Sequence, residues 1–110
     1  MQIQVINFQL KDLPVEEFQT LCDAIAPQWA AIPGLVSKVW IANEATNTYG
    51  GVYTWETREA LDNYLQSDLF KAIMTNPNFT NATSSEFDVI EGPTRVTHGL
   101  AAVVAGSPSQ

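Results

Sequence analysis

Residues 35–56 contain two short apolar runs separated by a polar segment, and this arrangement most strongly limits the possible folds of the chain. The runs LVSKVWIAN (35–43) and GGVYTWE (50–56) are rich in β-branched and aromatic residues, which favour strands. The polar segment between them has the composition of a turn. Two strands joined in this way form a hairpin. Within the second run, Gly50-Gly51 predicts a bulge or a close backbone approach.

A strand pattern and a helix pattern precede the hairpin. Residues 2–10 alternate imperfectly between two apolar sides, as expected of a strand. A helix is predicted to begin near Pro14, because apolar residues then recur at three- and four-residue steps. This apolar stripe consists of Phe18, Leu21, Cys22, Ile25 and Trp29. We expect Pro27 to kink the helix or end it early, and Pro33-Gly34 to stop it.

A second helical pattern and a further strand follow the hairpin. Thr57 is a candidate cap for a helix, which Ser67-Asp68 would break to leave a separate short helix at 69–74. Residues 75–85 have the composition of a loop, and residues 86–90 are predicted as the fourth strand. Gly92-Pro93 should interrupt this strand before a further extended piece at 95–98.

The predicted order is strand, helix, strand, strand, helix, strand. This is the α+β, ferredoxin-like split βαβ arrangement, in which a four-stranded antiparallel sheet carries its helices on one face. The length of 110 residues fits a single domain, which we place at residues 1–98. The tail at 99–110 is predicted to be mobile at its tip.

Both sides of the hairpin strands avoid water. One side of residues 35–42 carries Leu35, Ser37, Val39 and Ile41, and the other carries Val36, Lys38, Trp40 and Ala42. A sheet face open to water should instead be polar at every second residue. We therefore predict that a second copy of the chain covers the open face and forms a homodimer, the alternative being a monomer with one exposed, aggregation-prone face.

Composition excludes several classes of partner. The net charge of −7 disfavours binding to nucleic acid or an anionic membrane. No apolar run is long enough to span a bilayer, and no signal peptide is visible, so a cytoplasmic setting is expected. One cysteine, Cys22, and one histidine, His98, make no metal site, and no metal or cofactor is predicted.

Residues 33–65 resemble the YdhR-type monooxygenases of the dimeric α/β-barrel superfamily. The matching features are Pro33-Gly34, Lys38-Val39-Trp40, Gly50-Gly51 with Tyr53, and an Ala-Leu-x-x-Tyr-Leu helix at 60–65. The resemblance implies a dimer whose two sheets form a barrel, with a cavity between sheet and helices in each subunit. It also implies an oxygenase, and the superfamily includes cofactor-free oxygenases and haem-degrading oxygenases.

Few side chains are candidates for chemistry in such a cavity. Lys38 is an ammonium in an apolar strand that we expect to snorkel to the sheet edge or pair with an acid, and its functional alternative is to stabilise an anionic substrate. Tyr53 could donate its hydroxyl, and His98 titrates nearest neutrality but could simply lie at the surface or dimer edge. The candidates for substrate binding are Asn7, Phe8, Trp40, Tyr53, Trp55 and Tyr64. The aromatic residues among them could be both core and cavity wall.

The leading hypothesis is a cofactor-independent monooxygenase acting on a small apolar or aromatic molecule. The alternative is a non-catalytic ligand-binding or dimeric interaction module with the same fold. A haem-degrading enzyme ranks below both. Asn7 and Trp55 could take the places that an Asn and a Trp hold in some of those relatives, but the second helix contains no histidine to act as axial ligand.

Overall fold

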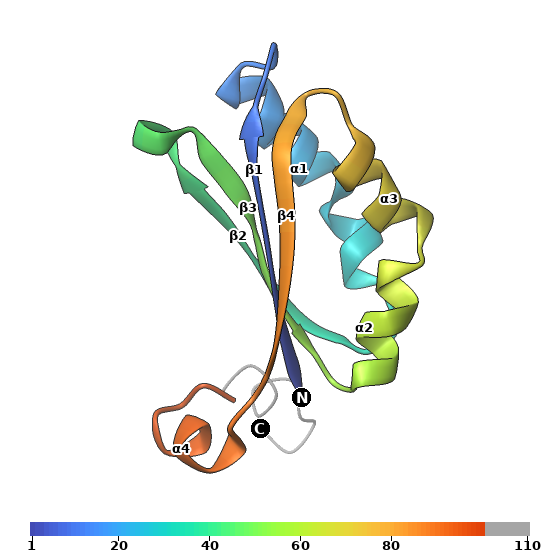
Figure 1. The fold of residues 1–110 in the computed structure, drawn as a ribbon, viewed down its shortest axis with the longest axis vertical. Coiled ribbons are helices and arrows are strands. Elements are labelled where there is room, and N and C mark those ends of the chain that lie inside the picture. The colour runs from blue at the N-terminus through green and yellow to red at the C-terminus, as the bar shows by residue number, and fades with distance from the viewer. Residues whose placement is uncertain (101–110) are drawn as a thin grey trace.

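The computed structural model describes residues 1–100, which form a four-stranded antiparallel sheet with helices on one face (Figure 1). The elements are β1 (Gln2–Leu10), α1 (Val15–Ala30), β2 (Leu35–Asn43), the 3-10 turn η1 (Glu44–Thr46), β3 (Thr48–Trp55), α2 (Arg58–Leu65), α3 (Asp68–Thr75), β4 (Phe79–Asp88) and α4 (Glu91–Val96). The strand order β2-β3-β1-β4 confirms the ferredoxin-like fold. The predicted mobile tip lies at 101–110, outside the described residues.

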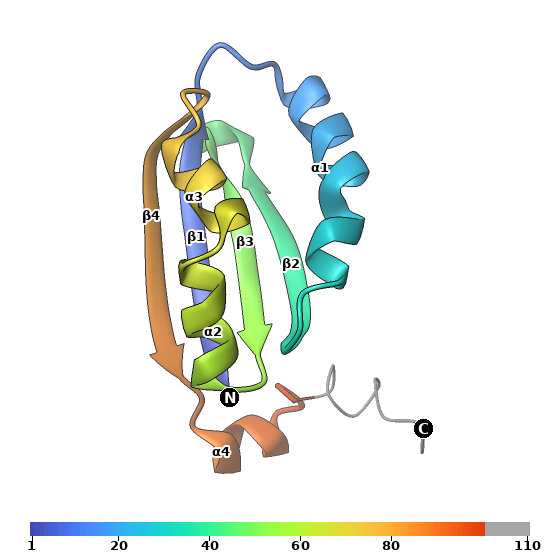
Figure 2. The same ribbon diagram turned by 90° about the vertical axis from the view of Figure 1, so that its right-hand side faces the viewer.

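Helices α1, α2 and α3 cover the same face of the sheet, whereas α4 lies at one end, away from that layer (Figures 1 and 2). Thr57 caps α2 as predicted, since its hydroxyl accepts a hydrogen bond from the amide of Ala60. Ser67 caps α3 in the same way, so the two short helices are separate. No helix in residues 1–100 combines the length and the apolarity needed to cross a bilayer.

Of the two effects predicted for Pro27, a kink or an early end of the first helix, the early end is wrong, because α1 continues to Ala30. A proline removes only one backbone donor, and the last turn is held by other contacts. The amide of Ala31 still bonds to the carbonyl of Pro27, and Trp29 is only 4% exposed in the core. Burial of this large ring outweighs the lost hydrogen bond.

The core lies between the sheet and the three helices. Along β1, alternate side chains from Gln2 to Phe8 are buried against the helices, while those between them point to the open face. The buried apolar residues are Ile6, Phe8, Phe18, Trp29, Tyr49, Tyr53, Trp55, Leu61 and Tyr64. All of these nine except Ile6 and Leu61 are aromatic, so ring packing dominates the core.

The fourth strand is longer than predicted, because residues 79–85 belong to β4 and not to a loop. β4 is an edge strand that pairs with β1 along almost its whole length. The register between β1 and β4 shifts between Asn7 and Gln9, and Asn81 on β4, in the same region, has a φ of 55°. This irregularity interrupts the two-residue alternation, and the small polar side chains suit an exposed edge. For both reasons, the sequence of residues 79–85 resembles that of a loop although these residues form a strand.

The hairpin also differs in detail from the prediction. β3 begins at Thr48, two residues earlier than expected. In β2 the register shifts between Leu35 and Ser37, so Leu35 packs on the core although it lies an odd number of residues from Lys38. Strict alternation placed these two residues on opposite sides.

The extended piece predicted at 95–98 is wrong. Residues Glu91–Val96 form the short helix α4, and His98 follows it in a turn with a φ of 67°. Pro93 lies in the first turn of α4, where a helix does not need the missing backbone donor.

Candidate functional site

A small apolar cavity lies between the sheet and helices α1 and α3. Its volume is about 30 Å³, which is room for roughly two water molecules. Strand β1 contributes Ile6 and Phe8, and α1 contributes Phe18, Cys22 and Trp29. The other lining residues are Leu21, Ile25, Lys38, Trp40, Gly50, Gly51, Tyr53, Ile73 and Phe79. Lys38 is the one basic side chain in this wall.

The amino group of Lys38 is enclosed by aromatic rings. Its Nζ atom lies 3.4 Å from the ring centroid of Trp40, 4.1 Å from that of Trp29 and 4.8 Å from that of Tyr53. Such distances allow the ring faces to attract an ammonium. The expectation that Lys38 would pair with an acid is not met within residues 1–100, where its amine makes no ion pair with a carboxylate.

Burial disfavours the charged form of Lys38. Desolvation lowers the pKa of its ammonium to about 7, while the neighbouring Cys22 acts in the opposite direction. The same burial raises the pKa of the Cys22 thiol, so that group stays protonated near neutral pH. Lys38 can therefore exchange a proton close to pH 7, a property that general bases need.

Two tyrosine hydroxyls meet behind the lysine. The hydroxyl oxygens of Tyr53 and Tyr64 are 3.4 Å apart, and the indole N–H of Trp29 donates to Tyr64 at 3.2 Å. Burial raises the pKa of both tyrosines well above the ordinary value. Both remain neutral hydroxyls, and that of Tyr53, which lines the cavity, can donate a hydrogen bond to an anion there.

Gly50 and Gly51 allow the backbone and the lysine to approach each other closely, as the sequence predicted. A Cβ atom at Gly50 would overlap the carbonyl of Ile6 on the neighbouring strand. At Gly51 it would lie 2.9 Å from Cε of Lys38 and 3.1 Å from Cε1 of Tyr53. The missing side chain of Gly51 thus makes the space in which Lys38 lies.

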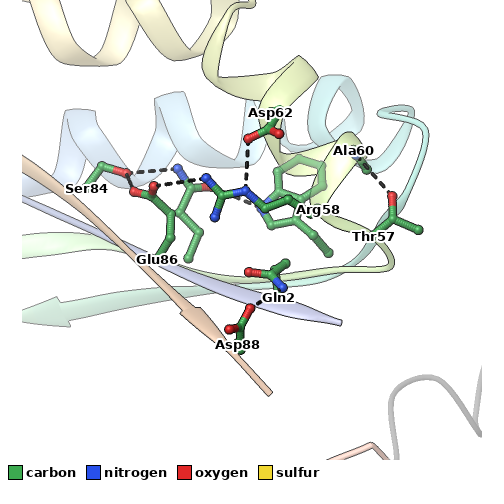
Figure 3. Close-up of polar contacts among 10 residues, drawn as sticks. Gln2, Thr57, Arg58, Ala60, Asp62, Ser84, Glu86 and Asp88 are labelled. Atoms are coloured by element: carbon green, nitrogen blue, oxygen red, sulfur yellow. Dashed lines mark hydrogen bonds and ion pairs between the residues drawn. The ribbon is translucent and has the colours of Figure 1, made fainter. Parts of the chain in front are cut away.

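A buried polar chain runs beside the cavity, under α2. The indole N–H of Trp55 donates to Oε1 of Gln4, and the amide nitrogen of Gln4 donates to the hydroxyl of Ser84. Ser84 then donates to Glu86, which faces Arg58 at 3.9 Å (Figure 3). Gln4 and Trp55 are fully buried, so each needs these partners. No local sequence pattern links Gln4 to Trp55, because the two residues lie 51 positions apart.

The structure brings together only some of the predicted site residues. Phe8, Trp40 and Tyr53 line the cavity with Lys38, while Trp55 and Tyr64 pack behind that wall. The other two candidates lie elsewhere. Asn7 alternates with buried Ile6 and Phe8 and so points to the open face of the sheet, and His98 is exposed after α4.

Sequence reasoning did not select the residues that the helices contribute to the wall. Phe18, Cys22 and Trp29 belong to the apolar stripe of α1, which indicated burial but not a cavity. Phe79 lay in the segment taken for a loop, and Ile73 on α3 had no distinguishing signal.

Trp40 separates the cavity from the surface. It is 36% exposed, and it lines two further grooves along α1 and β2 with volumes of about 430 and 350 Å³. Cys22 belongs to the first groove and Trp29 and Lys38 to the second, as well as to the cavity. A different conformation of the Trp40 side chain would therefore connect the cavity with the two grooves.

The residues of this chain do not fit a haem held by histidine. Asn7 and Trp55 lie on opposite faces of the sheet, so they cannot converge on one ligand. The sole histidine, His98, is exposed and is absent from the cavity wall. Within residues 1–100, no three His, Cys, Asp or Glu side chains gather in a way that could hold a metal ion.

Comparison with known protein families identifies the family of this chain. The family described as "Putative mono-oxygenase ydhR" matches residues 3–100. The chain belongs to this family. The ydhR family assignment agrees with the resemblance of residues 33–65 and extends it over nearly the whole sequence. No curated protein sequence matches the chain.

Solved structures share the fold of this ydhR-family chain. MhuD from Mycobacterium tuberculosis, a haem degrader with two haems bound in its active site, is 19% identical, with a TM-score of 0.65 over 82% of this chain and 96% of MhuD. SnoaB from Streptomyces nogalater, a cofactor-independent oxygenase, is 19% identical, with a TM-score of 0.61 over 80% of this chain and 92% of SnoaB. At these identities the likeness establishes the fold alone, while the family supports a monooxygenase-type function.

Proposed function

We propose that this protein is a cofactor-independent monooxygenase that oxidises a small apolar or aromatic molecule in the cavity beneath Trp40. The observation that carries the proposal is the amine of Lys38, which lies among three rings in an apolar cavity of a ydhR-family fold. Few other side chains in that cavity can accept a proton near pH 7.

Oxidation without a cofactor requires a substrate that itself supplies electrons to dioxygen. Phenols, enols and activated methylene groups do so after losing a proton. For an activated methylene, the carbanion adds to O₂, the peroxide takes up the proton, and loss of water leaves a ketone. The balance is R₂CH₂ + O₂ → R₂C=O + H₂O, so the reaction needs a base but no external reductant.

Lys38 is the proposed base. With a pKa of about 7, its amine is free to accept the substrate proton at neutral pH, and the resulting ammonium is attracted by the surrounding ring faces. The ammonium also stabilises the substrate anion beside it, because charges interact more strongly away from water. The hydroxyl of Tyr53 is the proposed donor to the anionic oxygen.

Substrate size sets a condition on this mechanism. The present cavity of about 30 Å³ is too small for an aromatic molecule, since drug-sized ligands fill several hundred Å³. The adjoining grooves have such volumes, and Trp40 lies between them and the cavity. In the proposed function, Trp40 moves aside when the substrate enters. Homodimer formation through the open sheet face completes the proposed barrel.

Oxygen uptake with a panel of quinols, anthrone-like compounds and enolisable ketones tests this function. We expect uptake with at least one class, one oxygen atom of O₂ in the product, and loss of at least ~90% of the rate in Lys38→Met, as for loss of a general base. Lys71→Met, which changes an exposed lysine on α3, is the matched control.

Two outcomes distinguish catalysis from binding alone. Measurable ligand binding without uptake across the panel would favour the non-catalytic ligand-binding module. Unchanged turnover in both Lys38→Met and Tyr53→Phe would show that the proposed base and donor are not involved.

A further inference from the structure

Lys38 differs from the other two lysines of the chain in its surroundings. Lys11 and Lys71 are exposed, whereas the amine of Lys38 lies against three rings inside the cavity. Within residues 1–100 its amine has neither a carboxylate partner nor a hydrogen-bond acceptor. Its lone pair is therefore not engaged when the group is neutral.

We propose that Lys38 is a covalent binding site for small neutral aldehydes, which it holds as an imine inside the cavity. This inference goes beyond the proposed monooxygenase, because it needs the enclosed amine but no oxidation. A buried lysine in an apolar pocket is a known kind of activated nucleophile for carbonyl compounds.

The reaction is a condensation that leaves all oxidation states balanced. The nitrogen lone pair attacks the carbonyl carbon, and the C=O π electrons move to oxygen, which takes up a proton to give a carbinolamine. Loss of that oxygen as water gives the imine: R–NH₂ + R′CHO → R–N=CHR′ + H₂O. A neutral imine is less polar than an ammonium, so the apolar wall favours the product. When protonated, the imine gains the same attraction to the rings as the ammonium has.

The size and polarity of the cavity define the ligand class. About 30 Å³ admits roughly two water-sized groups beside the amine, which suits acetaldehyde. A carboxylate-bearing aldehyde would bury a charge in an apolar wall, and the neutral imine of Lys38 supplies no cation to pair with it. Bulkier aldehydes such as benzaldehyde require Trp40 to leave its position between cavity and grooves.

The groups that face the amine do not compete for the aldehyde under mild conditions. Cys22 on α1 and Tyr53 on β3 are the titratable side chains of the wall, with Tyr64 of α2 behind Tyr53. Burial raises the pKa of all three, so they stay protonated and weakly nucleophilic near pH 7. From α3 and β4 the wall receives only Ile73 and Phe79.

Reductive trapping tests the site directly. The protein is incubated at pH 7 with acetaldehyde and cyanoborohydride, without any oxygenase substrate, and each amine is quantified by peptide mapping. An ordinary lysine has a pKa near 10.4 and is almost entirely protonated at this pH, so we expect alkylation of Lys38 to exceed that of Lys11 and Lys71 by about tenfold or more. Acetaldehyde should also exceed benzaldehyde at Lys38.

The variants Lys38→Arg and Lys71→Arg provide matched controls. Arginine keeps the charge and the ring contacts but forms no stable imine, so Lys38→Arg should lose the dominant modification while Lys71→Arg keeps it. The terminal amine of Met1 is mapped separately. Equal modification of the three lysines in the wild type would overturn the proposal, and that result does not depend on whether a variant folds. Oxygen uptake is not measured here, so failure of either hypothesis leaves the other open to its own test.

Discussion

At the scale of single residues, burial and the surrounding rings act on the ammonium of Lys38 in opposite directions. Burial disfavours its ammonium, whereas the ring faces of Trp29, Trp40 and Tyr53 attract it by about 0.5–2 kcal/mol each in a desolvated setting. A pKa of about 7 means that both protonation states occur near neutral pH. The same balance makes the residue a candidate base and a cost to stability.

Replacing Lys38 with methionine should stabilise the protein most at low pH. The pKa of Lys38 is about 7 in the folded protein and near 10.4 in an unfolded chain, so the unfolded chain binds more protons between these values. The stability of the wild type therefore rises with pH across this window, by up to about 1.4 kcal/mol per pH unit. Lys38→Met lacks this contribution, and its advantage should shrink from pH 7 to pH 8.5 in urea unfolding.

Comparison of the two proteins isolates the lysine. Cys22 and the buried tyrosines have raised pKa values, so their contribution is lost as pH rises above the ordinary thiol and phenol values. A constant stability difference between wild type and Lys38→Met from pH 7 to pH 8.5 would mean that the folded protein does not lower the pKa of Lys38.

Gln4 is the second residue with a clear energetic role. Gln4→Leu leaves the indole N–H of buried Trp55 without its acceptor, and a buried unpaired donor costs about 1–3 kcal/mol. We expect a loss of about 2 kcal/mol in the free energy of unfolding, measured in urea. Gln28→Leu, on the exposed side of α1, should change stability by less than about 0.5 kcal/mol. Equal stability of the two variants would contradict the role of the polar chain.

At the scale of elements, the register of β2 against β3 determines the part of the cavity wall that the sheet contributes. Lys38 pairs with Tyr53 and Trp40 pairs with Gly51, so the lysine side chain lies over Gly51, where β3 has no side chain. A register shifted by one residue would turn the lysine and the rings to the open face. The bulge at the start of β2 and the pairing along the rest of the strand fix this arrangement.

Gly51→Ala tests that arrangement. The new methyl group would lie 2.9 Å from Cε of Lys38, so the lysine must shift, and overpacking of this kind costs about 1–3 kcal/mol. We expect lower stability and weaker trapping of acetaldehyde at Lys38. Gly92→Ala in α4 is the control, because nothing lies within 4 Å of the added atom. If Gly51→Ala behaves like Gly92→Ala in both measurements, the space at Gly51 does not determine the position of Lys38.

At the scale of the whole molecule, the open face of the sheet is apolar along a cross-strand row. Val5, Val52 and Val39 are in register on neighbouring strands, and the face also carries Phe87, which is 54% exposed. The helices cover only the other face (Figure 2). An apolar row of this kind is typical of a surface that another protein copy covers.

We therefore expect light scattering at micromolar concentration to give about twice the 12.1 kDa mass of one chain. Val39 is 57% exposed, so Val39→Glu should leave the subunit folded while shifting the dimer toward monomer. Ala24→Glu, on the exposed surface of α1, should leave the mass unchanged. A wild-type mass near 12.1 kDa would contradict the dimer.

The sequence by itself determined the element order as far as the fourth strand, the hairpin and the strand character of Lys38, Trp40 and Tyr53, because periodicity and turn chemistry are local properties. It missed most of β4, where a bulge interrupts the alternation, and it misplaced Leu35 for the same reason. Only the tertiary structure decided that the helix residues Trp29 and Cys22 meet Lys38, that Trp55 bonds to Gln4, and that Asn7 and His98 lie elsewhere. These contacts join residues far apart in the chain, and their geometry depends on strand register and helix placement, which no local pattern records.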